Sequence, residues 1–337
     1  MKRVNKRKLG KTGLMVGEIG LGGIPIQRTT QEETNKIIDE CMERGINFID
    51  TARAYTCSEA YFGHALQGKR EAFILCTKSM ARSYEAMKKD IELSLSALQT
   101  DYIDIYQLHN VKTEQEYAEV MSPNGAYKAL LEAKASGKIG YIGITSHNVD
   151  FLESIIDVCP FHTIQVPYNV IETKAENLFK RAIRKDIGVI VMKPLAGGAI
   201  DNGEVALKFI IKNDFISVAI PGMASINEVK ENSKVVKEEL NEEDKEYIKK
   251  IRRILDNDFC RRCGYCLPCP QGIDIPSCFV YEGYFDRYGL ASWAQDRYEK
   301  MNHFAGECIN CRRCVAKCPY GLDIPTKLKR VKRIFGK

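Results

Sequence analysis

The sequence predicts an α/β fold: a (β/α)8 TIM barrel followed by a small α-helical domain. Eight short apolar or β-branched runs alternate with amphipathic segments over residues 18 to about 237. Such alternation is typical of a parallel sheet covered by helices. Eight of the thirteen cysteines fall in two tight runs after that region. We therefore expect a barrel in residues 1–240, and a linker helix with a second domain in residues 241–337.

The eight strand candidates are short and apolar, as strands buried on both faces require. They are Glu18–Gly23, Ile46–Ala52, Ala72–Lys78, Tyr102–Asn110, Tyr141–His147, His162–Asn169, Gly188–Gly198 and Ile216–Met223. Eight parallel strands are the number that closes a barrel. An open, doubly wound sheet is the alternative, but no G-x-G-x-x-G motif follows the first strand.

Helical patterns lie between the strand candidates, with apolar residues recurring every three or four positions. They include Thr34–Gly45, Ser83–Thr100, Gly125–Gly137, Lys174–Asp186 and Glu204–Asp214. Glycines such as Gly45 and Gly137 mark helix ends, where a left-handed residue is favourable. Beyond the barrel, residues 241–258 form a charged amphipathic pattern that predicts the linker helix.

The two cysteine runs predict a pair of [4Fe–4S] clusters. The second run, C-x2-C-x2-C-x3-C-P, has the bacterial ferredoxin spacing, in which the last thiolate ligates the other cluster. The first run is one residue shorter before its last cysteine. The predicted ligands are Cys260, Cys263, Cys266, Cys269, Cys308, Cys311, Cys314 and Cys318. Structural zinc is the alternative, yet zinc sites usually show two separate C-x2-C pairs.

Residues 270–307, between the two runs, are too long and too aromatic for the loop of a compact two-cluster ferredoxin. They predict one or two short helices that pack beside the clusters. The second domain is therefore expected to be a helical, ferredoxin-like module.

The composition indicates the class of protein and the cellular compartment to expect. Hydrophobic content of 45% and charged content of 28% are ordinary for a globular protein. No stretch approaches the roughly 20 apolar residues of a membrane span, and the basic N-terminus lacks the apolar run of a signal peptide. The other five cysteines are scattered, which favours a reducing cytoplasm over a disulfide-bonded secreted protein. We expect a cytoplasmic protein with no membrane partner.

The formal charge of +6 is unevenly distributed. Residues 1–11 and residues 326–337 each carry six Lys or Arg and no acid, which leaves a net charge of −6 on the rest of the chain. Two thiolate-ligated clusters would add about −4 in the oxidised state. Basic tails bind nucleic acid in some proteins, but no nucleic-acid motif accompanies these. We expect solvated helix ends and no nucleic-acid partner.

Four chemically complementary residues lie at the C-terminal ends of consecutive strand candidates, where barrel enzymes place their active sites. They are Asp50, Tyr55, Lys78 and His109. A phenol has a pKa near 10, too high for proton donation at neutral pH. A nearby ammonium that is itself held by a carboxylate favours the phenolate and lowers that pKa. Such a set suits protonation of an oxygen that is becoming an alkoxide.

The chain resembles the aldo-keto reductase superfamily, and its tail resembles that of the ferredoxin-bearing branch. The strings that carry the resemblance are LGKTGLMVGEIGLGG, FIDTARAY, ILCTKS, YQLHN, GITSHN, IQVPYN, MKPLAGG and IPGMASINEVKEN. The resemblance implies that Tyr55 is the general acid, that Lys78 and Asp50 tune it, and that His109 orients the carbonyl. It also implies direct hydride transfer from a nicotinamide cofactor to an aldehyde or ketone.

The cofactor positions follow from the same resemblance. They are Gly23, Ser146, His147, Gln165, Met192, Lys193, Pro194, Leu195, Gly197, Pro221, Gly222, Met223, Glu228, Glu231 and Asn232. His147 stands where an asparagine is usual, and Met192 where an aromatic ring usually stacks on the nicotinamide. Gly222 and Glu228 replace the Lys and Arg that surround the 2′-phosphate of NADP. A glutamate repels a phosphate, so we expect a weak preference for NADP, or NAD in its place.

Several functions remain open at this level. The leading hypothesis is NAD(P)H-dependent carbonyl reduction with Tyr55 as the general acid, beside two clusters. A hydride carries two electrons and a cluster accepts one, so exchange between them would need a flavin, for which the sequence has no fingerprint. Alternatively, a ferredoxin or another electron-transfer protein feeds the clusters. The protein could also be a redox-sensing adaptor, or the clusters could serve only to hold the tail together.

Overall fold

A computed structural model describes residues 3–235 and 237–337. The chain forms two compact units. The first contains the chain up to Leu195 together with Asn202–Leu240. The second contains Ala196–Asp201 together with Asn241–Lys337.

The first unit is a closed (β/α)8 barrel, which confirms the predicted fold class. Its parallel strands follow the order of the sequence: β3 (Leu21–Gly22), β4 (Phe48–Asp50), β5 (Ile74–Ser79), β6 (Ile103–Leu108), β7 (Ile139–Thr145), β8 (Thr163–Pro167), β9 (Gly188–Met192) and β10 (Val218–Ala219). The first and last strands are joined as well. Gly20 N donates to Ala219 O and Gly22 N donates to Pro221 O, both at 2.8 Å. This seam excludes the open-sheet alternative.

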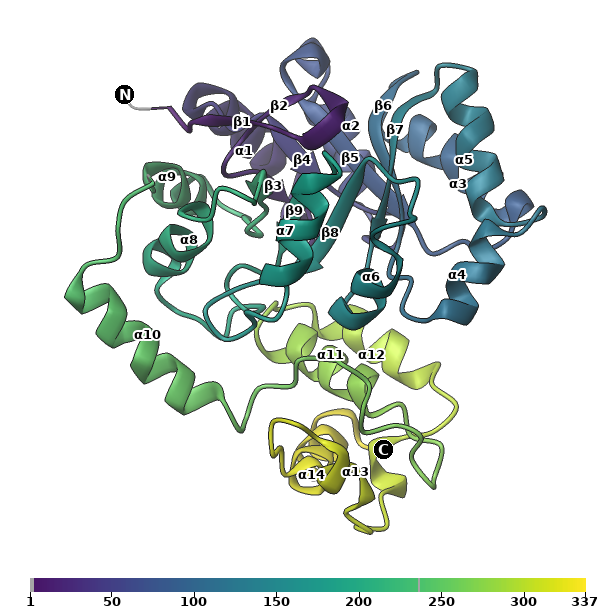
Figure 1. Cartoon of the computed structure of the whole chain (residues 1–337), viewed down its shortest axis with the longest axis vertical. Coiled ribbons are helices and arrows are strands. Elements are labelled where there is room, and N and C mark those ends of the chain that lie inside the picture. Colours follow the sequence, from purple (N-terminus) through teal and green to yellow (C-terminus); the bar gives the residue numbers. More distant parts are fainter. Residues whose placement is uncertain (1–2, 236) are drawn as a thin grey trace. The chain divides into compact units, whose positions relative to one another are not determined.

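Helices return the chain between consecutive strands and surround the barrel (Figure 1). They are α1 (Gln31–Arg44), α2 (Ser58–Ala65), α3 (Tyr84–Ala97), α4 (Glu114–Met121), α5 (Ala126–Ala135), α6 (Val149–Ile155), α7 (Glu176–Arg184), α8 (Gly203–Ile211) and α9 (Ile226–Lys234). Helix α1 illustrates how the sequence sets their ends. Thr30 and Glu33 form a capping box at its start, and Gly45, at a φ of 79°, ends it.

The strand predicted over residues 188–198 is too long. Strand β9 ends at Met192, and the chain then turns sharply. Lys193 and residues 196–198 have φ between 50° and 81°, a left-handed conformation that no strand contains. The segment after Met192 is therefore a loop.

The basic N-terminal segment is a β-hairpin, so the expectation of a solvated helix end was wrong there. Strands β1 (Lys6–Lys8) and β2 (Met15–Gly17) pair antiparallel. Between them, Leu9 is fully buried in the barrel core, and it packs against Gly188 at the beginning of β9. The hairpin therefore covers the barrel at the N-terminal ends of its strands, opposite the end where β4 and β5 present Asp50 and Lys78.

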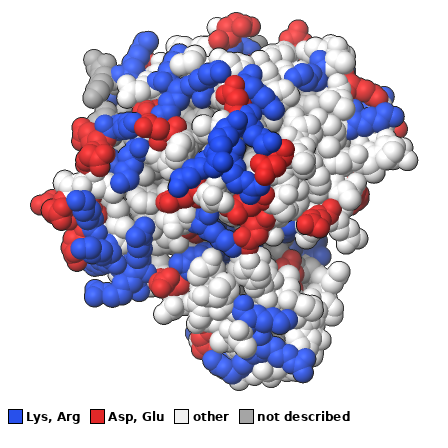
Figure 2. Space-filling view, viewed as in Figure 1, with Lys and Arg blue, Asp and Glu red and all other residues white. Residues whose placement is uncertain are grey.

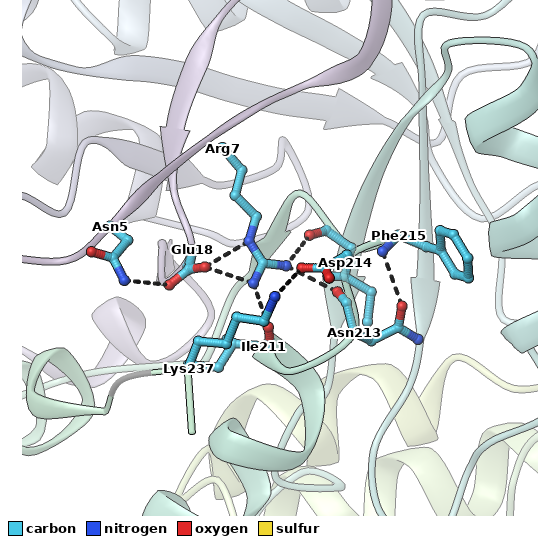
Figure 3. A network of polar contacts seen from close by, with 9 residues as sticks. Asn5, Arg7, Glu18, Ile211, Asn213, Asp214, Phe215 and Lys237 are labelled. Atoms are coloured by element: carbon cyan, nitrogen blue, oxygen red, sulfur yellow. Dashed lines mark hydrogen bonds and ion pairs between the residues drawn. The ribbon is translucent and has the colours of Figure 1, made fainter. Parts of the chain in front are cut away.

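Arg7 of the hairpin is used within the fold rather than exposed for a partner (Figure 3). Its guanidinium pairs with Glu18, which precedes β3, at 2.6 Å. It also donates to the carbonyls of Asn213 at 2.9 Å and of Ile216 at 2.7 Å, and to that of Ile211. These carbonyls lie between α8 and β10. Arg7 therefore links both sides of the barrel seam.

The second unit is helical, as predicted. It contains α10 (Glu242–Leu255), α11 (Ile275–Asp286), α12 (Ala291–Glu299), α13 (Arg313–Lys317) and α14 (Ile324–Phe335). Tyr298 of α12 stacks on Phe335 of α14 with ring centroids 4.3 Å apart. The Tyr298 hydroxyl also donates to the Lys337 carbonyl at 3.0 Å and accepts from Ala305 N at 2.8 Å. Two aromatic residues between the cysteine runs, Phe279 and Tyr298, thus belong to the buried core of this unit, and the other aromatic side chains of this stretch pack against it or lie at its surface.

We find no helix in residues 3–235 and 237–337 that has both the length and the apolar character needed to cross a membrane.

Candidate functional site

Asp50 and Lys78 form a buried ion pair at the C-terminal ends of neighbouring strands. Asp50 is the last residue of β4, and Lys78 is the penultimate residue of β5, which pairs with β4 in parallel. Lys78 Nζ lies 2.7 Å from both carboxylate oxygens of Asp50, and it also donates to the Thr51 carbonyl at 2.8 Å. Both side chains are almost fully buried. The ammonium is therefore held in one position by three acceptor atoms.

The electrostatics of Asp50 involve a residue from a third strand. Burial raises the pKa of the Asp50 carboxyl above its ordinary value, while the Lys78 ammonium and a hydrogen bond from Gln165 on β8 oppose that shift. Gln165 was assigned from the sequence only to the cofactor. Its contact with Asp50 was missed because the sequence does not say which strand-end side chains face each other across the barrel.

Tyr55 and His109 lie beside this ion pair. Tyr55 is in the loop after β4, where its amide donates to Ala52 O at 3.0 Å and its carbonyl accepts from Ser58 N at 2.7 Å. Lys78 Nζ is 5.2 Å from the centroid of the Tyr55 ring. The Tyr55 and His109 rings meet edge to face with centroids 6.2 Å apart. The four predicted residues are therefore neighbours at the barrel mouth.

His109 is held in its neutral form. Burial lowers the pKa of its imidazole well below the usual value, and the positive charges of Lys78, Arg82 and Lys112 act in the same direction. Arg82 fixes the backbone here by donating to the His109 carbonyl at 3.1 Å. At neutral pH, His109 therefore offers one N–H donor and one acceptor nitrogen rather than a positive charge.

A second buried carboxylate, that of Glu59, anchors the helix that follows the Tyr55 loop. Glu59 at the start of α2 is 2% exposed and pairs with Arg53. It also accepts from the Thr77 hydroxyl at 2.6 Å and from the Ser94 hydroxyl at 2.9 Å. These contacts connect α2 to β5 and α3. Sequence reasoning missed this group, although a glutamate four residues after Tyr55 within an otherwise apolar helix was a detectable signal.

Three buried polar atoms near the Asp50–Lys78 pair have no hydrogen-bond partner among the described residues. Within the described part of the chain, His109 Nδ1, Asn110 Oδ1 and Gln165 Oε1 are buried and accept or donate no hydrogen bond. His109 and Asn110 directly follow β6, and Gln165 is the middle residue of β8. Since buried polar atoms are normally hydrogen-bonded, the mouth is suited to a polar ligand. A carboxamide, as in nicotinamide, would satisfy the Gln165 oxygen.

Of the remaining predicted cofactor residues, Met192 ends β9, and the others lie on the loops after β3, β7, β9 and β10 and on α9. Ser146, Gly23, Pro194, Pro221 and Met223 are buried, whereas His147, Met192, Lys193, Leu195, Gly197 and Asn232 are half-buried and Glu231 is exposed. Met223 is fully buried. The Gly23 amide donates to the backbone carbonyl of Asp50 at 2.7 Å.

Gly222 and Glu228 have local structural roles. A Cβ atom at Gly222 would lie 2.6 Å from the Pro25 side chain, so a lysine does not fit there without movement. Glu228 is in the first turn of α9, where its carboxylate accepts from Ala224 N at 2.6 Å and from Ser225 Oγ at 3.3 Å. Its amide donates to Ser225 Oγ in return. Glu228 is thus fixed in position by the helix cap.

In the second unit, the eight predicted cysteine ligands line two hollows. One hollow is lined by Cys260, Cys263, Cys266 and Cys318. The other is lined by Cys269, Cys308, Cys311 and Cys314, and Cys266 lines this hollow as well. The last cysteine of each run therefore lies with the first three of the other run. This is the crossed arrangement of two-cluster ferredoxins.

The thiols of each hollow are arranged around an open space and do not converge on the position of a single ion. Among the residues that the structure describes, no three His, Cys, Asp or Glu side chains converge closely enough to bind one metal ion. Four thiols around a hollow fit a multi-iron cluster, since each iron at a corner takes one thiolate. The donor set is all sulfur in both hollows.

Comparison with known proteins agrees with both units. Residues 14–204 match the aldo/keto reductase family, and residues 259–323 match a 4Fe-4S dicluster domain. An L-galactose dehydrogenase from Arabidopsis thaliana is 29% identical over 311 residues, covering 76% of this chain and 96% of that protein. The oxidoreductase YqkF from Bacillus subtilis is 31% identical over 209 residues, covering 58% of this chain and 66% of that protein.

The solved structure of an aldo-keto reductase from Bacillus halodurans in its holo form is also similar. It has a TM-score of 0.64 and 28% identity, and the match covers 74% of this chain and 96% of that one. The chain therefore belongs to the aldo/keto reductase family and is an oxidoreductase with a C-terminal 4Fe-4S dicluster domain.

Proposed function

We propose that the protein reduces the carbonyl group of a small aldehyde or ketone, with Tyr55 as the proton donor. The observation that carries this proposal is the buried Lys78–Asp50 pair next to the Tyr55 ring. A fixed ammonium stabilises the phenolate that remains after Tyr55 has given up its proton. Burial of an ammonium costs desolvation free energy, and a role in proton donation explains why Lys78 is buried.

His109 would orient the substrate in this reaction. The low pKa of its imidazole keeps the ring neutral, so a ring N–H donates to the carbonyl oxygen without transferring a proton. Tyr55 then protonates that oxygen as negative charge develops on it. Reduced nicotinamide, when bound, supplies the hydride that the carbonyl carbon receives. Gln165 would hold its carboxamide while contacting Asp50.

We further propose that NADP is not preferred over NAD. The Pro25 side chain occupies the space that a side chain at Gly222 would need. This position therefore provides no lysine to contact a 2′-phosphate. The Glu228 carboxylate is fixed at the start of α9 by Ala224 N and Ser225 Oγ. A fixed negative charge at this place disfavours a phosphate more than a ribose hydroxyl.

The thiols of the second unit would hold two [4Fe–4S] clusters, one per hollow. Such clusters, when bound, exchange single electrons. Cys311 is exposed, so one site reaches the surface. This observation favours a second candidate function, in which an electron-transfer protein supplies the electrons for the reduction and Tyr55 supplies the protons.

The test is an anaerobic purification followed by addition of NADH or NADPH together with aldehydes and ketones. Carbonyl reduction at the expense of nicotinamide, with the visible cluster absorbance unchanged, supports the first proposal. Bleaching of that absorbance by nicotinamide would instead connect the clusters to turnover. Absence of nicotinamide oxidation with every carbonyl, in a protein that retains its iron, would contradict the first proposal and leave the second.

A further inference from the structure

The two ligand-bearing loops of the second unit carry positive charges and no negative ones. Residues 259–272 and 308–321 contain five Lys or Arg and no Asp or Glu. These are Arg261, Arg262, Arg312, Arg313 and Lys317. The fourteen residues of each loop include all four cysteines of the respective run, so these cations are the charges nearest to the hollows in the sequence.

The five cations do not have the same environment. Arg261 is buried, pairs with Asp256 at 3.1 Å and stacks on the Tyr320 ring at 4.0 Å. Its position suits compensation of a negative cluster inside the domain. Arg313 and Lys317, on α13, are exposed. Arg312 is also exposed, with its guanidinium 3.4 Å from Asp323. Exposed cations are poor at compensating a buried charge, so those on α13 need another explanation.

The same surface contains the exposed thiol and an exposed aliphatic side chain. Ile309 is 61% exposed and lies between Cys308 and the exposed Cys311. Single exposed apolar residues are common. Here Ile309 and the cation Arg312 both line the hollow, and an apolar residue beside positive charge is the mixture that weak electron-transfer interfaces use.

Helix α14 extends the positive surface. Lys329, Lys332 and Arg333 are exposed on it. The Lys332 side chain reaches the turn before Cys308, since a Cβ at Gly306 would lie 3.3 Å from Lys332 Cε. Figure 2 shows Lys and Arg gathered over α13 and α14 on the face in view. Lys332 therefore lies beside the turn from which the chain enters the loop of Cys308 and the α13 cations.

We propose that Ile309, Arg312, Arg313, Lys317 and Lys332, here called the α13 surface, dock an acidic protein that carries single electrons. The proposal rests on the proposed function in one respect, that the hollow lined by Cys308 and Cys311 holds a cluster. Charge complementarity identifies the partner as acidic. Cys311 is exposed and lines the hollow together with Ile309 and Arg312. An exposed cluster ligand identifies the partner as an electron carrier, because electron transfer needs a short distance to a cluster ligand.

The test uses the full-length protein, purified anaerobically with its clusters, and a small acidic [4Fe–4S] ferredoxin as the probe. The dissociation constant is measured at about 20 mM and about 200 mM salt, since exposed charges are screened at the higher concentration. Arg313→Glu and Lys332→Glu are the test variants. Lys300→Glu is the matched control, because Lys300 is also an exposed lysine of the second unit, on the α12 side.

We expect each test variant to weaken binding about tenfold at low salt, with unchanged iron content, and the control to bind like the wild type. Wild-type affinity that is unaffected by both substitutions would overturn the proposal. Equal binding of duplex DNA or anionic vesicles, lost in the same variants, would also overturn it by revealing a non-selective polyanion surface. Nicotinamide-dependent carbonyl reduction is measured on the same samples, so loss of the proposed activity is distinguished from loss of docking.

Discussion

The carboxylate of Glu59 accepts a 2.6 Å hydrogen bond from the Thr77 hydroxyl, which joins the segment that carries Tyr55 to the strand that carries Lys78. Removing the charge leaves Arg53 without its ion-pair partner at a largely buried place. We expect Glu59→Gln to lower the free energy of unfolding by about 2 kcal/mol, as measured by urea denaturation. It should also reduce kcat, because Tyr55 is no longer fixed relative to Lys78.

A control for that variant is Glu85→Gln, which neutralises an exposed glutamate in the first turn of α3. If Glu59→Gln were as stable and as active as this control, Glu59 would have no role in positioning Tyr55.

Tyr55→Phe removes the proposed proton donor and leaves the ring in place. We expect kcat/KM for carbonyl reduction to fall about a thousandfold, while the dissociation constant for nicotinamide, measured by fluorescence quenching, stays within about twofold. Turnover at the wild-type rate would place the chemistry elsewhere. Tyr61→Phe on α2 is the matched control for a lost phenol.

The crossed arrangement of the cysteines makes a specific prediction about paired substitutions. Cys260→Ser with Cys318→Ser disrupts one hollow only, whereas Cys260→Ser with Cys308→Ser disrupts both. We expect the first pair to retain about half of the iron and the second pair to lose nearly all of it, because a cube missing a thiolate is held weakly. Iron and acid-labile sulfide are measured after anaerobic purification. Loss of nearly all the iron from both pairs would instead show that each run serves its own cluster.

Cofactor preference depends on Glu228. We expect NADH to bind at least as tightly as NADPH to the wild type. Glu228→Gln should tighten NADPH binding about fivefold and leave NADH unchanged, which corresponds to ~1 kcal/mol for one partly exposed charge. The amide still accepts a hydrogen bond from Ala224 N, so the helix cap is preserved. Wild-type NADPH binding about tenfold tighter than NADH would contradict the role given to Glu228.

The His109 imidazole should make stability depend on pH. Its pKa is well below that of a histidine in the unfolded chain, so below about pH 6.5 the unfolded state binds a proton that the folded state does not. The free energy of unfolding therefore falls as the pH decreases through that value, and is constant with respect to this group at higher pH. His162 contributes in the same direction.

The effect of His109 is isolated by comparison with His109→Gln, measured as urea denaturation from about pH 5 to pH 8. The variant should have a shallower dependence below about pH 6.5. Identical slopes in the two proteins would mean that His109 is protonated in the folded state.

The fold could be read from the sequence because each βα unit repeats the same pattern, and because parallel strands that are buried on both faces are visibly apolar. The side chains at the strand ends were found for the same reason, since the C-terminal ends of all parallel strands in a barrel lie at one mouth. Lys78 and Asp50 are the clearest example. Partners that cross the barrel, such as Gln165 and Asp50, were not predictable, because the sequence gives neither the tilt of the strands nor the rotamers.

The N-terminal hairpin was missed because its strand, Lys6–Lys8, contains only basic residues. Burial of Arg7 depends on carbonyls contributed by the loop after α8, and no local pattern signals such an interaction. The exposure of the cations near Cys311 was not predictable from the sequence either. In each case, the missing information is long-range geometry rather than residue chemistry.

The Arg7 network has a consequence for synthesis of the chain. The guanidinium and its carbonyl partners are separated by 206 and 209 residues, and at about 5–20 residues per second a ribosome needs about 10–40 s to make that stretch. During this interval β3, the first strand of the barrel, lacks β10 as its neighbour. An unpaired strand edge can pair with other chains. Protection of the nascent N-terminal half by a chaperone would therefore matter most before residue 220 leaves the exit tunnel.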